Sequence, residues 1–328
     1  MKDIASERRT LLKAAVASGI AFASPLTRSE AAYPNRPIRV VFSLPPGGSG
    51  DAIARLISDG LSRALGVSVF VDNRPGGNGT IAVNNVMQSP ADGYTYLLTS
   101  TNMVLTPLLR KSNYDPYKDF LPVSECARQP LVFSVHSKVG VSTLADFIRN
   151  AKANPGKYSL GSFGVGSVAH LYGELLQEAS GIELLHVPFK GEAEAMRALV
   201  GGEIDSVFFG PSAVKPQADK GVLHMLAVVG QERLSVIPEV ATFPQLGYPS
   251  INLVGMHALY ARAGTPSAFV QRIMAEVGKV IATPEMSARI RDLGAIPVGG
   301  TGEQLLSEMK KHTQRWSVLI KQKNIHLE

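Results

Sequence analysis

Residues 38–51 read IRVVFSLPPGGSGD, an apolar run that passes into a glycine-rich loop. The run at 38–44 is typical of a strand that is buried on both faces of a sheet. Apolar residues then recur at helical spacing, at Ile53, Leu56, Ile57, Leu61 and Leu65. The stretch therefore predicts a strand, a loop and a helix in that order. Because a helix start without bulky side chains leaves backbone N–H groups uncovered, the loop is a candidate anion site.

A second stretch repeats this arrangement. Residues 158–170 read YSLGSFGVGSVAH and lead into another amphipathic helix. The two loops lie roughly one domain apart in sequence, so together they predict a cleft that holds a small anion from both sides. The candidate ligand-binding residues of the two loops are Pro46, Gly47, Gly48, Ser49, Gly50, Asp51, Ser162, Gly164, Gly166, Ser167 and His170.

Two side chains in these loops have an alternative interpretation. Asp51 is better suited to capping the helix than to contacting an anion, because two carboxylates repel each other. His170 follows Ser167 by about one helical turn, and it either faces the cleft or packs inside its own domain.

Four further residues are candidates outside the loops. Ser100 and Thr101 end a predicted strand, and ligands of α/β folds bind at the carboxyl ends of strands. Lys190 and Gly191 open another predicted helix. Lys190 either binds the ligand or is an ordinary surface charge.

Strand-like and helix-like segments alternate along the chain, which predicts an α/β fold. We expect two domains, each built from strands and helices. Extended segments at 122–135 and 251–260 are candidate crossovers, and a double crossover is a natural hinge. The predicted domains are then residues 32–129 with 255–328, and residues 130–254.

The first 31 residues predict an export signal. Arg8-Arg9 precedes an apolar stretch, 14–23, that is too short to span a bilayer, and this order is typical of a twin-arginine signal. Cleavage near Ala31 fits a small-x-small site, and residues 21–23 offer a second one. The mature chain of about 297 residues is then long enough for two domains and is expected in the periplasm.

Composition excludes several classes of site. The formal net charge is +6, and the scattered Lys and Arg residues suit attraction of small anions but not a nucleic-acid surface. The single cysteine, Cys126, rules out an intrachain disulfide and a thiolate-rich metal site. We expect no cofactor and no metal, and we interpret Cys126 as a packing residue.

The motifs of common enzyme classes are missing from the sequence. It contains no Gly-x-Ser-x-Gly elbow, no His-Glu-x-x-His motif and no Walker phosphate loop. Ser167 and His170 lack an evident carboxylate to orient the histidine, so they are weak evidence for a hydrolase. A binding protein is the preferred interpretation and a hydrolytic enzyme the less favoured one.

Several motifs, in order and spacing, resemble the Bug-type substrate-binding proteins of tripartite tricarboxylate transporters. They span essentially the whole chain after the export signal: YPNRPIR at 33–39, PGGxxD at 46–51, NRPG at 73–76, DGYT at 92–95, GxGSxxHL at 164–171 and HVPFKG at 186–191. The resemblance implies a two-domain Venus flytrap fold with mixed sheets flanked by helices. It also implies a periplasmic receptor that binds a carboxylated metabolite and delivers it to membrane transporter subunits, and we expect a monomer. A sensory receptor that signals to a membrane kinase is the alternative.

By similarity to this family, loop 46–51 holds one carboxylate and loop 161–170 contributes from the opposite domain. The chain departs from the family at 208–211, which read FFGP where relatives often carry an additional Asp. Without that acid, recognition of a ligand amino group is in doubt. The expected ligands are therefore di- or tricarboxylates, or an aromatic acid.

Overall fold

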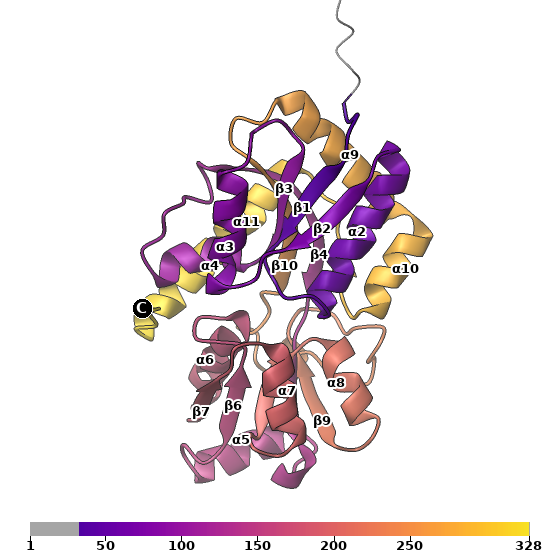
Figure 1. The fold of residues 1–328 in the computed structure, drawn as a ribbon. Helices are drawn as coiled ribbons and strands as arrows, with labels where there is room; N and C mark the ends of the chain where they lie inside the picture. Colours follow the sequence, from indigo (N-terminus) through magenta and orange to yellow (C-terminus); the bar gives the residue numbers. More distant parts are fainter. Residues whose placement is uncertain (1–32, 328) are drawn as a thin grey trace, which may run out of the picture. The chain divides into compact units, whose positions relative to one another are not determined.

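The computed structural model describes residues 33–327, which include two β-sheets with helices packed against them (Figure 1). The predicted export signal and its cleavage sites lie outside the described residues. Residues 36–328 form a single unit by their contacts, so the predicted domain boundaries stay a prediction.

The first sheet has six strands. Its order is β11 (Ile296–Pro297), β4 (Phe120–Gln129), β10 (Gly255–Arg262), β3 (Thr95–Ser100), β1 (Ile38–Phe42) and β2 (Val69–Asn73). β1, β2 and β3 are parallel, whereas β10 runs antiparallel to both β3 and β4. The apolar run of β1 is almost entirely buried, as its sequence predicts.

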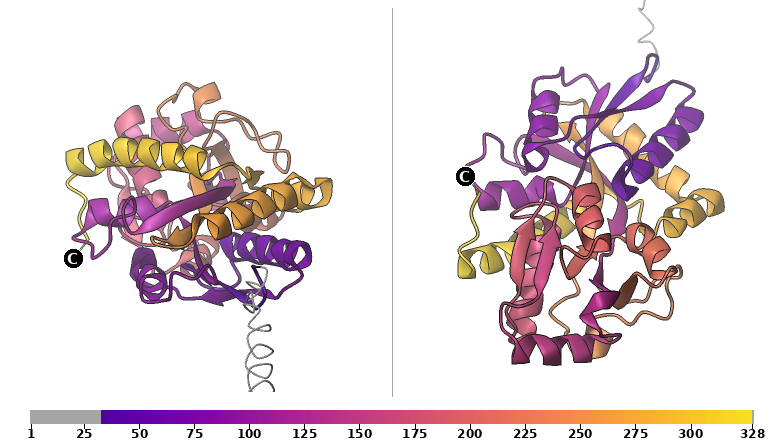
Figure 2. Two further views of the ribbon diagram at one scale, coloured as in Figure 1. Left: turned by 90° about the horizontal axis from the view of Figure 1, so that it is seen from above. Right: turned by 60° about the horizontal axis from the view of Figure 1, so that its bottom comes forward.

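Helices cover both faces of this sheet. They are α2 (Ser49–Leu65), α3 (Thr80–Met87), α4 (Asn102–Leu109), α9 (Ser267–Ala282), α10 (Pro284–Asp292) and α11 (Gly302–Gln322). One face carries an apolar cluster formed with α3, α4 and α11. α9 contacts the same strand, β4, from the side opposite α11, and α2 packs on α9 and α10 (Figure 2).

The second sheet has five strands. Its order is β7 (Leu185–Pro188), β6 (Ser159–Ser162), β8 (Ser206–Phe209), β5 (Val132–His136) and β9 (Leu223–Val228). The helices of this part are α5 (Leu144–Ala153), α6 (Val168–Ser180), α7 (Glu192–Val200) and α8 (Pro211–Ala218). Three short 3-10 helices complete the assignment: η1 (Gly77–Gly79), η2 (Ser137–Val139) and η3 (Pro244–Leu246).

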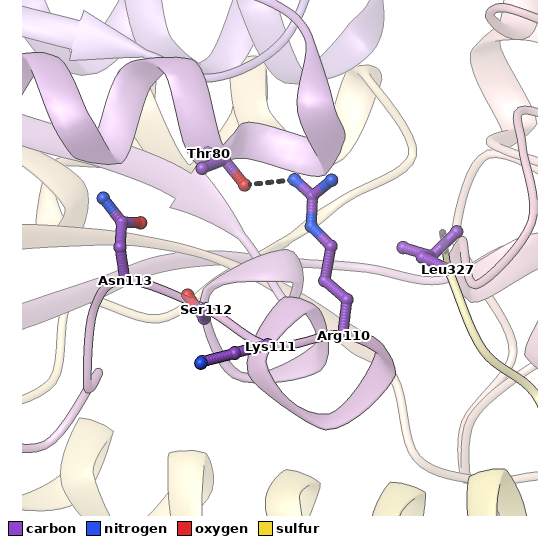
Figure 3. A pocket seen from close by; sticks show the side chains of 6 residues that line it. All are labelled: Thr80, Arg110, Lys111, Ser112, Asn113 and Leu327. Carbon is purple, nitrogen blue, oxygen red and sulfur yellow. Dashed lines mark hydrogen bonds between the residues drawn. The ribbon is translucent and has the colours of Figure 1, made fainter.

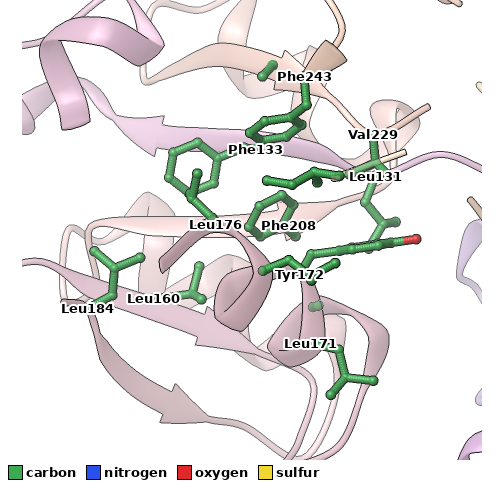
Figure 4. Close-up of a cluster of buried hydrophobic side chains, with 14 of the residues drawn as sticks. Leu131, Phe133, Leu160, Leu171, Tyr172, Leu176, Leu184, Phe208, Val229 and Phe243 are labelled. Atoms are coloured by element: carbon green, nitrogen blue, oxygen red, sulfur yellow. The ribbon is translucent and has the colours of Figure 1, made fainter. Parts of the chain in front are cut away.

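An aromatic and aliphatic cluster fills the second sheet's core (Figure 4). Phe133 and Phe208 lie with ring centroids 5.0 Å apart, and Tyr172 of α6 packs on Phe208 at 5.7 Å. The cluster also takes in Leu109 of α4 and Trp316 of α11, which belong to the helices around the first sheet. Apolar packing therefore continues from one sheet's helices to the other's.

The α/β class with two mixed sheets is confirmed, but the crossovers are shorter than predicted. Most of 122–135 is paired strand, since β4 and β5 occupy it and only residues 130–131 lie between them. The return segment 251–260 likewise contains the first six residues of β10. Both segments are extended because they complete sheets. Cys126 lies within β4 and is fully buried, as predicted for a packing residue.

Candidate ligand-binding site

The carboxyl ends of the first sheet's parallel strands share one edge. There β1 ends at Phe42 and β3 at Ser100. β10 is antiparallel to β3, so it begins at this edge with Gly255, and Gly255 is in register with Gln129, the last residue of β4. In open α/β sheets this edge is where ligands bind.

The second sheet presents its own carboxyl edge nearby. β6, β7 and β8 run parallel and end at Ser162, Pro188 and Phe209. β5 is antiparallel to β8 and begins at that edge with Val132. Because β5 follows β4 after two residues, the chain itself brings the two carboxyl edges together.

Side chains and backbone from the two edges meet at several points. Asn78 Nδ2 donates to the Val165 carbonyl over 3.4 Å. A Cβ atom built on Gly210, the residue before α8, would lie 3.3 Å from Gln129 Nε2 and 3.6 Å from Ser49 Oγ. The first glycine-rich loop, the end of β4 and the start of α8 are therefore neighbours.

The first loop is open. Residues 45–48 are exposed, and a side chain at Gly47 or Gly48 would meet no atom within 4 Å. Gly48 is the N-cap of α2 and provides no side-chain cap. Within residues 33–327, no hydrogen bond uses the N–H groups of Ser49 or Gly50. These two groups, at the positive end of a 17-residue helix, are free to bind an anion.

Asp51 holds this loop in place. Its carboxylate accepts hydrogen bonds from the Gly47 N–H at 3.1 Å, from Arg55 Nε at 2.9 Å and from Asn73 Nδ2 at 2.8 Å. Burial alone would raise the pKa of Asp51, but the hydrogen bonds from Arg55, Asn73 and Gly47 outweigh it and lower the pKa below its usual value. The buried carboxylate is fully engaged in positioning the loop.

Ser100 and Thr101 lie at the same edge but differ in their freedom. Thr101 is buried, and its Oγ1 accepts a hydrogen bond from the Met256 N–H at 3.0 Å, which fixes the start of β10. Ser100 is half-buried, and its Oγ accepts only a long bond, 3.4 Å, from the Asn102 N–H.

The second loop is closed upon itself. Ser167 is the N-cap of α6: its Oγ accepts from the His170 N–H and donates to the Gly164 carbonyl at 2.7 Å. Ser162 Oγ accepts from the Gly164 N–H at 3.2 Å. The Gly166 N–H donates to His170 Nδ1 at 3.1 Å. Its polar groups mostly bond to one another.

The buried side chain of His170 pairs with the half-buried imidazole of His186. Its ring stacks on His186 with centroids 3.9 Å apart and an interplanar angle of 8°. Burial lowers the pKa of His170 to about 4, and burial with the neighbouring His170 lowers that of His186 to about 4. Both rings are therefore neutral at pH 7. His186 Nε2 lies 2.7 Å from Ser162 Oγ, which ties the pair to the loop.

Lys190 and Gly191 lie at the start of α7. Lys190 is exposed, and Gly191 is an N-cap without a side-chain cap. Glu192, the first residue of the helix, has its pKa raised to about 7 by burial. This helix start therefore offers one exposed cation and one carboxyl group that is partly protonated at neutral pH.

Sequence reasoning missed two polar residues at the shared edge. Gln129 is 7% exposed, and neither its Nε2 nor its Oε1 has a hydrogen-bond partner among the described residues. His257 of β10 is 5% exposed with an unpartnered Nδ1, and burial lowers its pKa to about 4. Their positions at the edge follow from antiparallel pairing, which only the sheet order reveals.

A further cavity lies away from this edge. It has a volume of about 530 Å³ and is lined by Thr80, Arg110, Lys111, Ser112, Asn113 and Leu327 (Figure 3). The Arg110 guanidinium donates to the Gly77 carbonyl at 2.9 Å and to Thr80 Oγ1 at 2.7 Å, so its charge is spent on holding η1. No sequence-predicted site residue lines this cavity. The open helix start at the sheet edge is chemically the stronger candidate.

Residues 53–325 match the family described as "Tripartite tricarboxylate transporter family receptor", TctC. The chain belongs to this receptor family. It is similar to "UPF0065 protein in tcbD-tcbE intergenic region" of Pseudomonas sp. strain P51, with 34% identity covering 97% of this chain and 95% of the relative. It is also 32% identical to "Protein BugT" of Bordetella pertussis, over 90% of this chain and 92% of that protein. The predicted Bug-type resemblance is confirmed.

Solved structures resemble this TctC-family receptor over most of its length. "R. palustris Rpa4515 with adipate" has a TM-score of 0.84 at 31% identity and covers 90% of this chain and 99% of its own. "Periplasmic binding protein BugD" has a TM-score of 0.81 at 29% identity, covering 90% and 100%. "MatC (Rpa3494) from Rhodopseudomonas palustris with bound malate" has a TM-score of 0.79 at 26% identity, covering 88% and 100%.

These comparisons confirm the flytrap fold and show that the TctC-family receptor resembles binding proteins. Within residues 33–327, no helix is both long and apolar enough to cross a membrane. The same residues contain no group of three or more His, Cys, Asp or Glu side chains that could hold a metal ion.

Proposed function

We propose that this receptor binds a small di- or tricarboxylate, or an aromatic acid, between its two sheet edges in the periplasm and delivers it to a tripartite tricarboxylate-type transporter. One observation carries the proposal: the uncapped start of α2 at Gly48, where the Ser49 and Gly50 N–H groups are free. A carboxylate satisfies these donors and gains from the helix dipole.

Backbone donors alone are strong enough for this task. A hydrogen bond to a charged group contributes roughly 1.5–3 kcal/mol, and a partly buried helix N-terminus adds up to ~2 kcal/mol. A few such contacts reach about 8 kcal/mol, which corresponds to a micromolar dissociation constant. Ser100, half-buried at the same edge, is a further sequence-predicted hydroxyl for the ligand.

The distal end of the ligand would lie against the second sheet's edge. Lys190 is the sequence-predicted cation there, and its exposed ammonium can approach a second carboxylate without a fixed geometry. Ser162, Gly164, Gly166, Ser167, His170 and Gly191 remain predicted contributors to this wall. The absence of an acidic side chain at 208–211 supports ligands without an amino group.

The related receptors solved with adipate and malate support a dicarboxylate as the first ligand to test. A ligand present at 100 times its dissociation constant stabilises the native state by about 2.7 kcal/mol. A thermal-shift screen of di- and tricarboxylates, aromatic acids and amino acids, followed by calorimetry, should therefore yield a carboxylate that binds at micromolar concentration. If amino acids stabilise the protein and plain dicarboxylates do not, the proposed ligand class is wrong.

Delivery needs a separate experiment. Uptake of the identified ligand into cells that carry the transporter's membrane subunits should require this receptor, and the Gly48→Val variant should not support uptake. A receptor that binds the ligand but has no effect on uptake would favour the sensory alternative.

The export signal is tested separately. N-terminal sequencing of exported protein would test cleavage near Ala31, and a lysine replacement of Arg8-Arg9 would test the export route.

A further inference from the structure

Gln129 is a buried amide without partners at the point where the two sheet edges meet. The side chain is 7% exposed, and both Nε2 and Oε1 lack a hydrogen bond among residues 33–327. An unpaired buried polar group is costly to folding, and an amide head has both donors and acceptors to satisfy. In a binding protein, an unpaired buried amide of this kind indicates that the ligand itself supplies the missing hydrogen bonds.

The surroundings of the amide place it within the proposed site. Gln129 ends β4 opposite Gly255, and its Nε2 would lie only 3.3 Å from a Cβ at Gly210. That same Cβ position is 3.6 Å from Ser49 Oγ, at the first turn of α2. Because Gly210 has no side chain, the start of α8 approaches both the Gln129 amide and the first turn of α2 closely.

The sheet around the amide does not satisfy it, since neither Nε2 nor Oε1 has a hydrogen-bond partner among residues 33–327. The N–H of Gly255 and its strand partners belong to the sheet, and Thr101 Oγ1 is already the acceptor for Met256. A carboxylate ligand would accept from Nε2 but could not donate to Oε1. A ligand that carries a hydroxyl next to a carboxylate would satisfy both atoms.

We infer that Gln129 recognises the hydroxyl-bearing end of a hydroxycarboxylate, so that the receptor prefers hydroxydicarboxylates over dicarboxylates of the same chain length. This inference rests on the proposed function. A site built to bond a hydroxyl discriminates strongly against the analogue that lacks it, because the protein's polar atoms are then buried unpaired. Gln129 is then the specificity-determining residue, and the start of α2 provides the affinity common to both ligands.

The test compares L-malate and succinate, which differ by a single hydroxyl, in calorimetric titrations of wild type and Gln129→Met. Wild type should bind malate at least tenfold more tightly than succinate. Gln129→Met has nearly the same length and no polar atoms, so the ratio should fall below threefold, chiefly through weaker malate binding. Its melting temperature without ligand should be equal to or above that of wild type, since an unpaired buried amide has been removed.

Two controls separate the possible failures. Gln314→Met, at an exposed position of α11, should keep the wild-type ratio, and Gln129→Leu repeats the test should Gln129→Met fold poorly. Equal binding of malate and succinate by wild type would overturn this inference and leave the carboxylate function intact. Wild-type protein that binds neither these two acids nor any other carboxylate would overturn both.

Discussion

The two glycine-rich loops look alike in sequence and differ in how their hydrogen bonds are used. The first leaves residues 45–48 exposed and begins α2 at Gly48, which caps nothing. The second begins α6 at Ser167, whose hydroxyl caps the helix and also binds the Gly164 carbonyl. The first loop leaves its helix start without a side-chain cap, whereas the second caps the His170 N–H with Ser167 and leaves the Val168 and Ala169 N–H groups without a hydrogen bond among residues 33–327.

We interpret this difference as a division of roles, in which the first loop binds the ligand and the second forms a rigid wall of the site. A helix start attracts an anion only while its N–H groups are unpaired, and a side-chain cap uses that capacity. The first loop obtains its shape indirectly, from the Asp51 carboxylate behind it. The second obtains its shape from its own hydroxyls and from the His170–His186 stack, so we expect it to be a firm wall.

The largest effect is expected from Gly48→Val. The backbone at Gly48 is extended, with φ −86° and ψ 171°, which a β-branched residue favours, and no atom lies within 4 Å of the new Cβ. The fold should lose less than about 1 kcal/mol, since Gly48 makes no side-chain cap to lose. Its methyl groups would cover the free donors, so calorimetry should show affinity at least about 100-fold weaker, equal to two lost charged hydrogen bonds.

Gly48→Ala should give an intermediate loss, because one methyl group covers less of the donor row. Gly50 is unsuited to this test: a Cβ there would lie 2.8 Å from His257 Cε1 and 3.2 Å from Phe42 Cζ, so overpacking would lower stability. Normal affinity in a folded Gly48→Val protein would show that the first loop does not bind the ligand.

Asp51→Ala should produce the next largest effect. The substitution removes the carboxylate that accepts from the Gly47 N–H and Asn73 Nδ2, and a hydrogen bond to a charged group contributes about 1.5–3 kcal/mol. The loop would lose its support, so the hydrogen bonds from the loop to the ligand carboxylate should weaken. Affinity should then fall about tenfold. Urea unfolding and calorimetry measure the two effects. Asp59→Ala, exposed on the same helix, should change neither.

The sequence predicted the framework of both loops but not their difference. Apolar runs and glycine punctuation located β1 and α2, and they located β6 and α6, because burial and helix starts depend on local pattern. Whether a hydroxyl faces a ligand or its own loop depends on backbone torsions. The sequence predicted Ser167 as a ligand-binding residue, and in the structure its hydroxyl caps α6.

The sequence pattern did not predict which residues sheet pairing brings together. Gln129 ends a strand that the sequence suggested only as a crossover. Its closeness to Ser49 depends on β4 lying parallel to β1 with two strands, β10 and β3, between them. The stack of His170 on His186 likewise joins a helix to a strand 16 residues further along. Such contacts follow from strand order, which a single sequence does not specify.

Acid should loosen the second loop before the first. The pKa of buried His170 is lowered to about 4, below its unfolded value near 6.5, so its contribution to stability is complete above about pH 6.5 and declines as pH falls toward 4. His170→Gln removes this titration. Between pH 6.5 and 5, wild type should therefore lose about 1 kcal/mol more unfolding free energy than the variant.

Two other titratable groups face the His170 ring and must be kept unchanged in this comparison. They are His186, whose pKa is also lowered to about 4, and Glu174, whose carboxylate lies 3.7 Å from His170 Nε2. His326→Gln, at an exposed position near the C-terminus, is the matched control and should follow the wild-type pH profile. Parallel profiles for wild type and His170→Gln would mean that the imidazole pair is not held neutral by the fold.

The smallest effect, and the sharpest contrast, is expected from Ser167→Ala. The hydroxyl accepts from the His170 N–H at 3.4 Å and donates to the Gly164 carbonyl at 2.7 Å, and both bonds exist without ligand. Loss of a serine cap costs about 1 kcal/mol of stability, so urea unfolding should show a decrease of that size. Affinity should change less than about threefold, because a hydroxyl that is bonded within its loop does not bond to the ligand.

Ser49→Ala is the reciprocal variant: Ser49 caps nothing at the start of α2, so its replacement should leave the free energy of unfolding unchanged. If Ser167→Ala instead weakens binding tenfold while stability is unaffected, the serine turns to the ligand on binding. Both loops would then bind the carboxylate directly, and the contrast between an open and a closed loop would hold only for the protein without ligand.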